Sequence, residues 1–135
     1  MSKIFLSHSS KDKEKYVDPI VKILARNIGP SNLIYDKYNF DTNYPMKAQI
    51  KEALKETELF VLFLSVNSVN SKWVKFEIEE AMSLYNENIK DICCINLYNN
   101  ELDRNILNKY GDNFKPQNVN NIEEAVNIII KHYHS

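Results

Sequence analysis

The sequence contains very little glycine. Only Gly29 and Gly111 occur among its 135 residues, so it holds neither a G-x-G-x-x-G dinucleotide fingerprint nor a Walker A loop. A nucleotide bound here is therefore not held by a glycine-rich phosphate cradle.

Long apolar runs are missing as well, because no stretch approaches the roughly 20 residues that span a bilayer. The opening residues 1–6 show no signal-peptide pattern, and we expect a cytoplasmic protein without a membrane partner.

The sequence also contains few cysteines and carries almost no net charge. Cys93 and Cys94 are adjacent, and neighbouring side chains in a strand point to opposite faces, which disfavours a disulfide between them. We expect two small buried thiols. The 17 basic and 18 acidic residues leave a formal charge of −1, which gives no electrostatic basis for binding nucleic acid. The histidines and cysteines show no recognised ligand spacing, so no metal site is expected.

Short apolar runs alternate with amphipathic stretches along the whole chain. The run 59–64 is apolar on both faces, which is typical of a central strand covered by helices on both sides. The alternation predicts an α/β domain with a mainly parallel sheet of four to five strands, whose ligands bind beyond the carboxyl ends of the strands. Strands are expected at 3–7, 33–36, 59–64 and 91–97, and helices before Gly29, from Pro45 to Thr57, from Ser71 to Tyr85 and from Ile122 to Tyr133.

Some local features leave alternatives open. Pro19 either kinks the first helix or marks its true first turn. Residues 65–70 are expected to form a turn. Residues 99–113 are expected to be irregular, with a short helix near Leu107, and an edge strand near Phe114 is limited by Pro116.

One carboxylate lies on the wrong face of its helix. At about 100° per residue, the helix from Ser71 to Tyr85 gathers its apolar side chains on roughly half of its circumference. Glu77 falls inside that arc, one turn after Trp73. A glutamate there is costly unless it is paired or lines a cleft. It either sits at the rim, bonded to a backbone group or a lysine, or meets a cationic ligand beside the indole.

Three segments, in this order and spacing, resemble the TIR (Toll/interleukin receptor) domain. Residues 4–9, Ile-Phe-Leu-Ser-His-Ser, resemble its first strand and loop. Residues 34–45 resemble its second strand and the mobile loop that follows. Residues 62–77 resemble its third strand and the S-x-W-x-x-x-E signature of its enzymatic members, here Ser71, Trp73 and Glu77. Many members carry a glycine in the mobile loop, whereas 41–44 reads Asp-Thr-Asn-Tyr here.

The resemblance implies a flavodoxin-like three-layer sandwich, with residues 1–135 forming a single TIR domain. It also implies that the protein cleaves NAD, as substrate rather than cofactor, to nicotinamide and linear or cyclised ADP-ribose, in bacterial anti-phage defence. Asp36 is alternatively a strand-end cap, and His8 a surface residue. The implied site comprises Glu77 as the catalytic carboxylate, with Trp73, His8, Ser9, Ser10, Asp36 and Ser71 binding the substrate.

Two other functions compete with the enzyme. A non-catalytic adaptor would act through TIR–TIR association and use the loop 37–44, and Glu77 would then be incidental. A receiver-type phosphoacceptor domain shares the architecture, but it requires an acidic residue at the end of the third strand, where Ser65 stands. Self-association is expected for enzyme and adaptor alike, and a fused or partner effector domain is left open.

Overall fold

The predicted parallel sheet is present and has five strands. The computed structural model describes residues 3–35, 45–97 and 104–135, the side chains of 104–106 excepted. All the strand pairs are parallel, and their order is β2-β1-β3-β4-β5. This confirms the flavodoxin-like α/β fold. The strands are β1 (Lys3–Ser7), β2 (Leu33–Ile34), β3 (Thr57–Leu64), β4 (Asp91–Asn96) and β5 (Pro116–Asn118).

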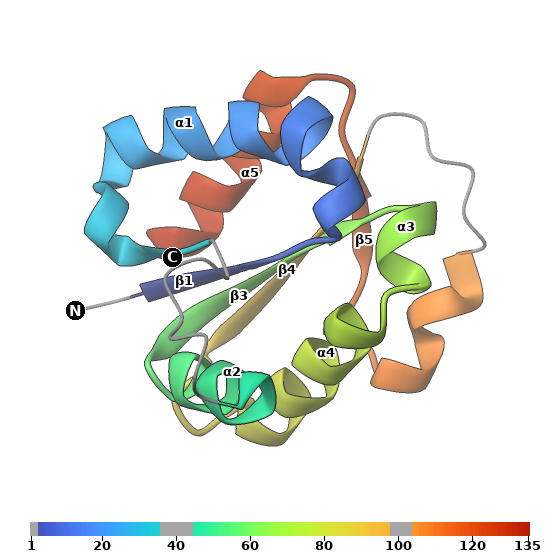
Figure 1. Ribbon diagram of the computed structural model, residues 1–135. Helices are drawn as coiled ribbons and strands as arrows, with labels where there is room; N and C mark the ends of the chain where they lie inside the picture. The colour runs from blue at the N-terminus through green and yellow to red at the C-terminus, as the bar shows by residue number, and fades with distance from the viewer. Residues whose placement is uncertain (1–2, 36–44, 98–103) are drawn as a thin grey trace.

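Helices cover both faces of the sheet, as the two-faced apolar pattern of β3 predicts (Figure 1). On one face, Val61 and Phe63 pack with α1 (Asp18–Ile28) and α5 (Ile122–Tyr133). On the other face, Phe60 and Leu62 pack with α2 (Met46–Lys55) and α4 (Lys72–Leu84). The side chains alternate along each strand, so one strand supplies both cores.

The adjacent cysteines of β4 follow the same alternation. Cys93 belongs to the core under α1 and α5, and Cys94 to the core under α2 and α4. Both are free and buried, as predicted. Burial, assisted by the negative charge of Asp91, raises the pKa of the Cys93 thiol to about 12. Burial also raises the pKa of Cys94.

The first helix resolves the alternatives at Pro19. The chain passes from the short helices η1 (Ser10–Asp12) and η2 (Lys13–Val17) directly into α1, where proline occupies the first turn. Pro19 therefore marks the first turn of the regular α-helix and does not kink it, because a first-turn residue needs no backbone N–H. Gly29, at φ 87°, ends α1 and lets the chain turn into the short helix η3 (Pro30–Asn32).

Local expectations at the edges of three elements were wrong. Residues 65–70 are not a plain turn, since Val66–Val69 form the one-turn helix α3, fixed by a reciprocal capping box between Ser65 and Ser68. Thr57 begins β3 instead of ending the preceding helix. The short edge strand expected near Phe114 exists as β5, but it begins at Pro116, which an edge strand tolerates because proline's missing N–H can face away from the ladder. The short helix near Leu107 is confirmed as η5 (Arg104–Tyr110).

Within the described ranges, no helix is long and apolar enough to cross a membrane.

Candidate active site

A hydrogen bond joins the end of β1 to the second turn of α4. Ser7 is the last residue of β1 and, by alternation, shares the face of Phe5, which packs in the core under α2 and α4. Its hydroxyl donates to Glu77 Oε1 at 2.7 Å. This contact places the predicted catalytic carboxylate at the carboxyl edge of the sheet, where ligands bind in open α/β folds.

Glu77 lies on the buried face of α4, as the helical periodicity predicts. Its exposed fraction is 2%, and Val74 and Ile78 beside it are also buried. The residue is therefore not at the rim of the helix, the location that the non-functional alternative required. Ser71 starts α4 by accepting a hydrogen bond from the Val74 amide at 3.2 Å. Its hydroxyl thus serves as an N-cap, which fixes where the helix begins and how Glu77 faces the sheet.

Trp73 lies in the first turn of α4, one turn before Glu77. Its indole is half-buried and packs against the core that α2 and α4 share. The ring meets Phe76 edge-on at a centroid distance of 6.4 Å, and Lys72 Nζ lies 5.9 Å from its centroid. A half-buried indole of this kind offers a rigid apolar surface for stacking.

The loop after β1 and the start of η1 carry the three residues that the resemblance implied as substrate contacts. His8 is buried, not at the surface, and its Nδ1 donates to the carbonyl of Leu6 at 2.9 Å. Its ring lies against Tyr35 at a centroid distance of 5.0 Å. Ser9 is also buried and caps η1 by accepting from the Lys11 amide, whereas Ser10 is exposed. Asp36, the remaining predicted contact, lies outside the described residues.

A second buried carboxylate, that of Asp12, lies near the same edge of the sheet. Its burial was not predicted from the sequence. It is 2% exposed. The Ser65 hydroxyl donates to its Oδ2, and Asn67 Nδ2 donates to its Oδ1 at 2.8 Å. Asp12 thereby ties the loop after β1 to the β3–α3 junction, so its role is to fix the two loops that border the site.

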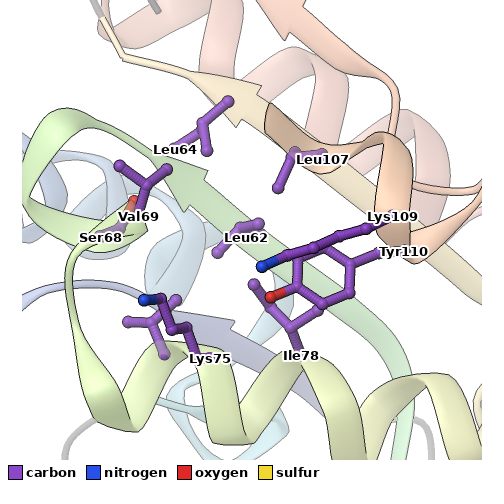
Figure 2. Close-up of a pocket in the computed structure, with 10 residues that line it drawn as sticks. Leu62, Leu64, Ser68, Val69, Lys75, Ile78, Leu107, Lys109 and Tyr110 are labelled. Atoms are coloured by element: carbon purple, nitrogen blue, oxygen red, sulfur yellow. The ribbon is translucent and has the colours of Figure 1, made fainter. Parts of the chain in front are cut away.

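A small cavity lies elsewhere on α4 (Figure 2). Its volume is about 30 Å³, which holds about two water molecules and is far too small for a dinucleotide. Neither Glu77 nor Trp73 lines it. Lys75 and Lys109 reach it from α4 and η5. The remaining lining residues are Leu62, Leu64, Ser68, Val69, Val74, Ile78, Leu107 and Tyr110.

Ser7 was expected at the ligand edge of the sheet, at the end of the first strand, but its contact with Glu77 was not predicted. A signal was present, since Ser7 is a small polar residue that ends an apolar strand on the same face as Phe5. What the sequence does not show is which helix residue lies opposite. Among the residues that the structure describes, no group of three histidine, cysteine or acidic side chains is arranged to hold a metal ion.

Fold and site together define an α/β domain with a buried carboxylate at the carboxyl edge of a parallel sheet. Residues 4–126 match the TIR domain family. The chain belongs to this family.

Curated relatives with enzymatic names match part of the chain. The NAD(+) hydrolase TcpC of Escherichia coli is 28% identical over 86 residues, which cover 62% of this chain and 27% of the relative. The 2′ cyclic ADP-D-ribose synthase AbTIR of Acinetobacter baumannii is 26% identical over 76 residues, covering 56% of this chain and 28% of the relative. The probable 2′ cyclic ADP-D-ribose synthase TcpO of Methanobrevibacter olleyae is 28% identical over 85 residues, covering 62% and 24%. The matched part is about a quarter of each relative's length.

Solved structures share the fold at low sequence identity. The crystal structure of the RPS4 and RRS1 TIR domain heterodimer superposes with a TM-score of 0.69 at 14% identity, covering all of both chains. The TIR domains of an activated resistosome give a TM-score of 0.62 at 14% identity, covering 98% of this chain and 72% of the other. Both neighbours are TIR domains within assemblies.

Proposed function

We propose that this TIR domain cleaves the nicotinamide–ribose bond of NAD and that Glu77 is its catalytic carboxylate. The observation that carries the proposal is the position of Glu77. It is buried on α4 at the ligand-binding edge of the sheet, bonded to Ser7 and one turn from the indole of Trp73. The relatives TcpC and AbTIR are named as an NAD(+) hydrolase and a 2′ cyclic ADP-D-ribose synthase, which supports the same chemistry.

The reaction needs one carboxylate. Breaking the N-glycosidic bond gives its electron pair to the nicotinamide nitrogen, so nicotinamide departs neutral and requires no proton. Positive charge develops on the ribose, and a fixed negative charge beside it stabilises the transition state. Water then attacks the ribosyl carbon and releases a proton, which gives ADP-ribose. Attack by a hydroxyl group of the same molecule gives a cyclic isomer. Ordinary glycosidases need a second carboxyl group as the acid.

The remaining predicted residues take binding roles in this proposal. Trp73 stacks on an aromatic ring of NAD and excludes water. His8, Ser9 and Ser10 lie on the loop after β1 and contact the phosphates or ribose. Ser71, also predicted to bind the substrate, is the exception, since its hydroxyl caps α4 and so positions Glu77. Asp36 is proposed as a further contact on the family resemblance alone, and NAD is substrate rather than cofactor.

The burial of Glu77 has a consequence for access. Because 2% of the residue is exposed, ribose reaches the carboxylate only when the surrounding side chains rearrange. Association of TIR domains is one event that supplies such a rearrangement, and both structural neighbours are assemblies. We therefore propose that the activity requires self-association, and expect specific activity to rise with protein concentration. The roles in a bacterial cytoplasm and in anti-phage defence stay predictions.

Nicotinamide release from NAD tests the proposal. The protein is incubated with NAD at several protein concentrations, beside a Glu77→Ala variant whose folding is checked by circular dichroism. Release by the parent and its loss in the folded variant is the expected result. Equal rates in both would remove Glu77 from the mechanism. Chromatography of the products then separates linear from cyclised ADP-ribose.

The second candidate function is a non-catalytic adaptor that binds other TIR domains. The likeness to a TIR domain heterodimer favours it. Self-association without nicotinamide release at any protein concentration would support the adaptor.

A further inference from the structure

The bond between Ser7 and Glu77 connects two elements that are 70 residues apart in sequence. Both side chains are buried, with exposed fractions of 1% and 2%. A hydroxyl donor 2.7 Å from a buried carboxylate oxygen forms a charge-assisted hydrogen bond, which is stronger and more directional than a neutral one.

The hydroxyl of Ser7 is held in place by the sheet. β1 is an interior strand that pairs with both β2 and β3, and Ser7 lies in register with Leu62. The carboxylate is held from the other side, because Val74, Ile78 and Ala81 anchor α4 in the core. The bond therefore fixes the orientation of the carboxyl group relative to the sheet edge and not only relative to its own helix.

The chemistry of the partner matters as much as its position. A lysine or arginine in the place of Ser7 would offset the negative charge that the ribosyl cation needs. A serine hydroxyl orients the carboxylate and leaves its full charge in place. Holding a charged group in its productive orientation before the reaction removes reorganisation from the barrier.

Resting on the proposed function, we propose that Ser7 is a positioning residue of the NAD-cleaving reaction, aligning the Glu77 carboxylate with the ribosyl carbon through its hydroxyl. Ser7 acts through Glu77 and not by touching NAD. Its loss should therefore lower kcat while leaving KM almost unchanged, since substrate binding is carried by other residues.

Three variants of the full chain test this role. Ser7→Ala removes the hydroxyl, and we expect kcat to fall roughly 10- to 100-fold with KM within about threefold of the parent. Ser7→Thr keeps a hydroxyl at the same position and should recover most of the lost kcat. The matched control is Thr57→Val, which removes another buried hydroxyl, bonded to the Ala53 carbonyl at 2.9 Å on the opposite edge of the sheet. It should lower stability but leave kcat at the parent value.

The outcomes separate this inference from the proposed function. One outcome is that the parent releases nicotinamide, that Glu77→Ala does not, and that folded Ser7→Ala keeps the parent kcat. This outcome overturns the role of Ser7 and leaves the proposed NAD cleavage by Glu77 standing. An equal fall of kcat in Thr57→Val also overturns it, because the effect would then come from general destabilisation. A parent that releases no nicotinamide, or releases it equally with Glu77→Ala, overturns the proposed function, and the role of Ser7 falls with it.

Discussion

Two buried carboxylates lie near the same edge of the sheet, and each accepts a hydrogen bond from a serine, Ser7 at the end of β1 or Ser65 directly after β3. Asp12 receives the hydroxyl of Ser65 and the amide of Asn67, one on each oxygen. Glu77 receives the hydroxyl of Ser7 on Oε1 and lies one turn from Trp73. Their exposed fractions are equal, at 2%. Burial alone therefore does not distinguish a carboxylate that fastens loops from the one proposed to be catalytic.

The difference lies in what the partners connect. Both partners of Asp12 belong to the β3–α3 junction, so the cluster closes one loop onto another. Glu77 is carried by a long helix, and its bond to Ser7 holds the carboxylate near the carboxyl edge of the sheet, where ligands bind in open α/β folds. A carboxylate that fastens loops is expected to contribute to stability, and a carboxylate aimed at the ligand edge to activity.

Glu77→Gln should have the largest effect. The amide keeps the shape of the side chain and can still accept from Ser7, but it removes the charge, so we expect nicotinamide release to fall by about 10³-fold. The free energy of unfolding should change by less than about 1 kcal/mol, because the hydrogen bond survives. Nicotinamide release and urea denaturation measure the two quantities. A Gln variant as fast as the parent would contradict the distinction between the two carboxylates.

Asp12→Ala should show the opposite profile. Without the Asp12 carboxylate, the donors of Ser65 and Asn67 lose their acceptor, and the Ser65 hydroxyl is buried. We therefore expect the free energy of unfolding to fall by about 2–4 kcal/mol. The kcat of the folded fraction should stay within about threefold of the parent. Urea denaturation followed by circular dichroism checks the first effect. A folded variant that loses as much activity as Glu77→Gln would place Asp12 in the chemistry.

The cysteines show what burial does to titratable groups in the core. Burial raises the pKa of Cys93 to about 12 and also raises that of Cys94. Above the ordinary thiol pKa of about 8.5, the unfolded chain loses these protons while the folded chain keeps them. The stability present below that pH is therefore lost as the pH rises towards 12, by up to about 1.4 kcal/mol per cysteine per pH unit.

Urea denaturation at pH 8, 9 and 10 measures this alkaline loss. Cys93→Ala should show a shallower decline than the parent above pH 9, although it is less stable at pH 8. If the stability of Cys93→Ala and of the parent declined in parallel above pH 9, the alkaline loss of stability would not come from the Cys93 thiol. Native Cys93 and Cys94 should also react slowly with a thiol reagent at pH 8 and rapidly once the protein is unfolded.

Asn67→Ala should have the smallest effect. It removes one of the two donors to Asp12 and leaves Ser65 in place, so we expect a loss of about 1 kcal/mol in the free energy of unfolding. The matched control is Asn70→Ala, whose exposed amide donates to the Val66 carbonyl at 2.9 Å, and whose loss should cost less than about 0.5 kcal/mol. Equal losses would show that the bond from Asn67 to Asp12 adds nothing beyond an exposed contact.

The prediction from sequence succeeded where the signal is local. Helical periodicity placed Glu77 on the buried face of α4, and the two-faced apolar run 59–64 identified the central strand. It failed at α3, because four residues are too few to show periodicity and Ser65 and Ser68 also suit a turn. It also left His8 open between surface and site, and the ring contact with Tyr35 that accompanies its burial comes from a distant segment.

The sequence by itself determined the order of strands and helices, the two cores and the face on which Glu77 lies. These follow from periodicities of about 2 and 3.6 residues, which a window of one strand or one long helix displays and the four residues of α3 do not. The tertiary structure alone decided that Ser7 meets Glu77 across 70 residues and that Ser65 and Asn67 enclose Asp12 across 53 and 55. Those partners are fixed by sheet register and helix packing, which bring distant residues together without leaving a pattern in the chain between them.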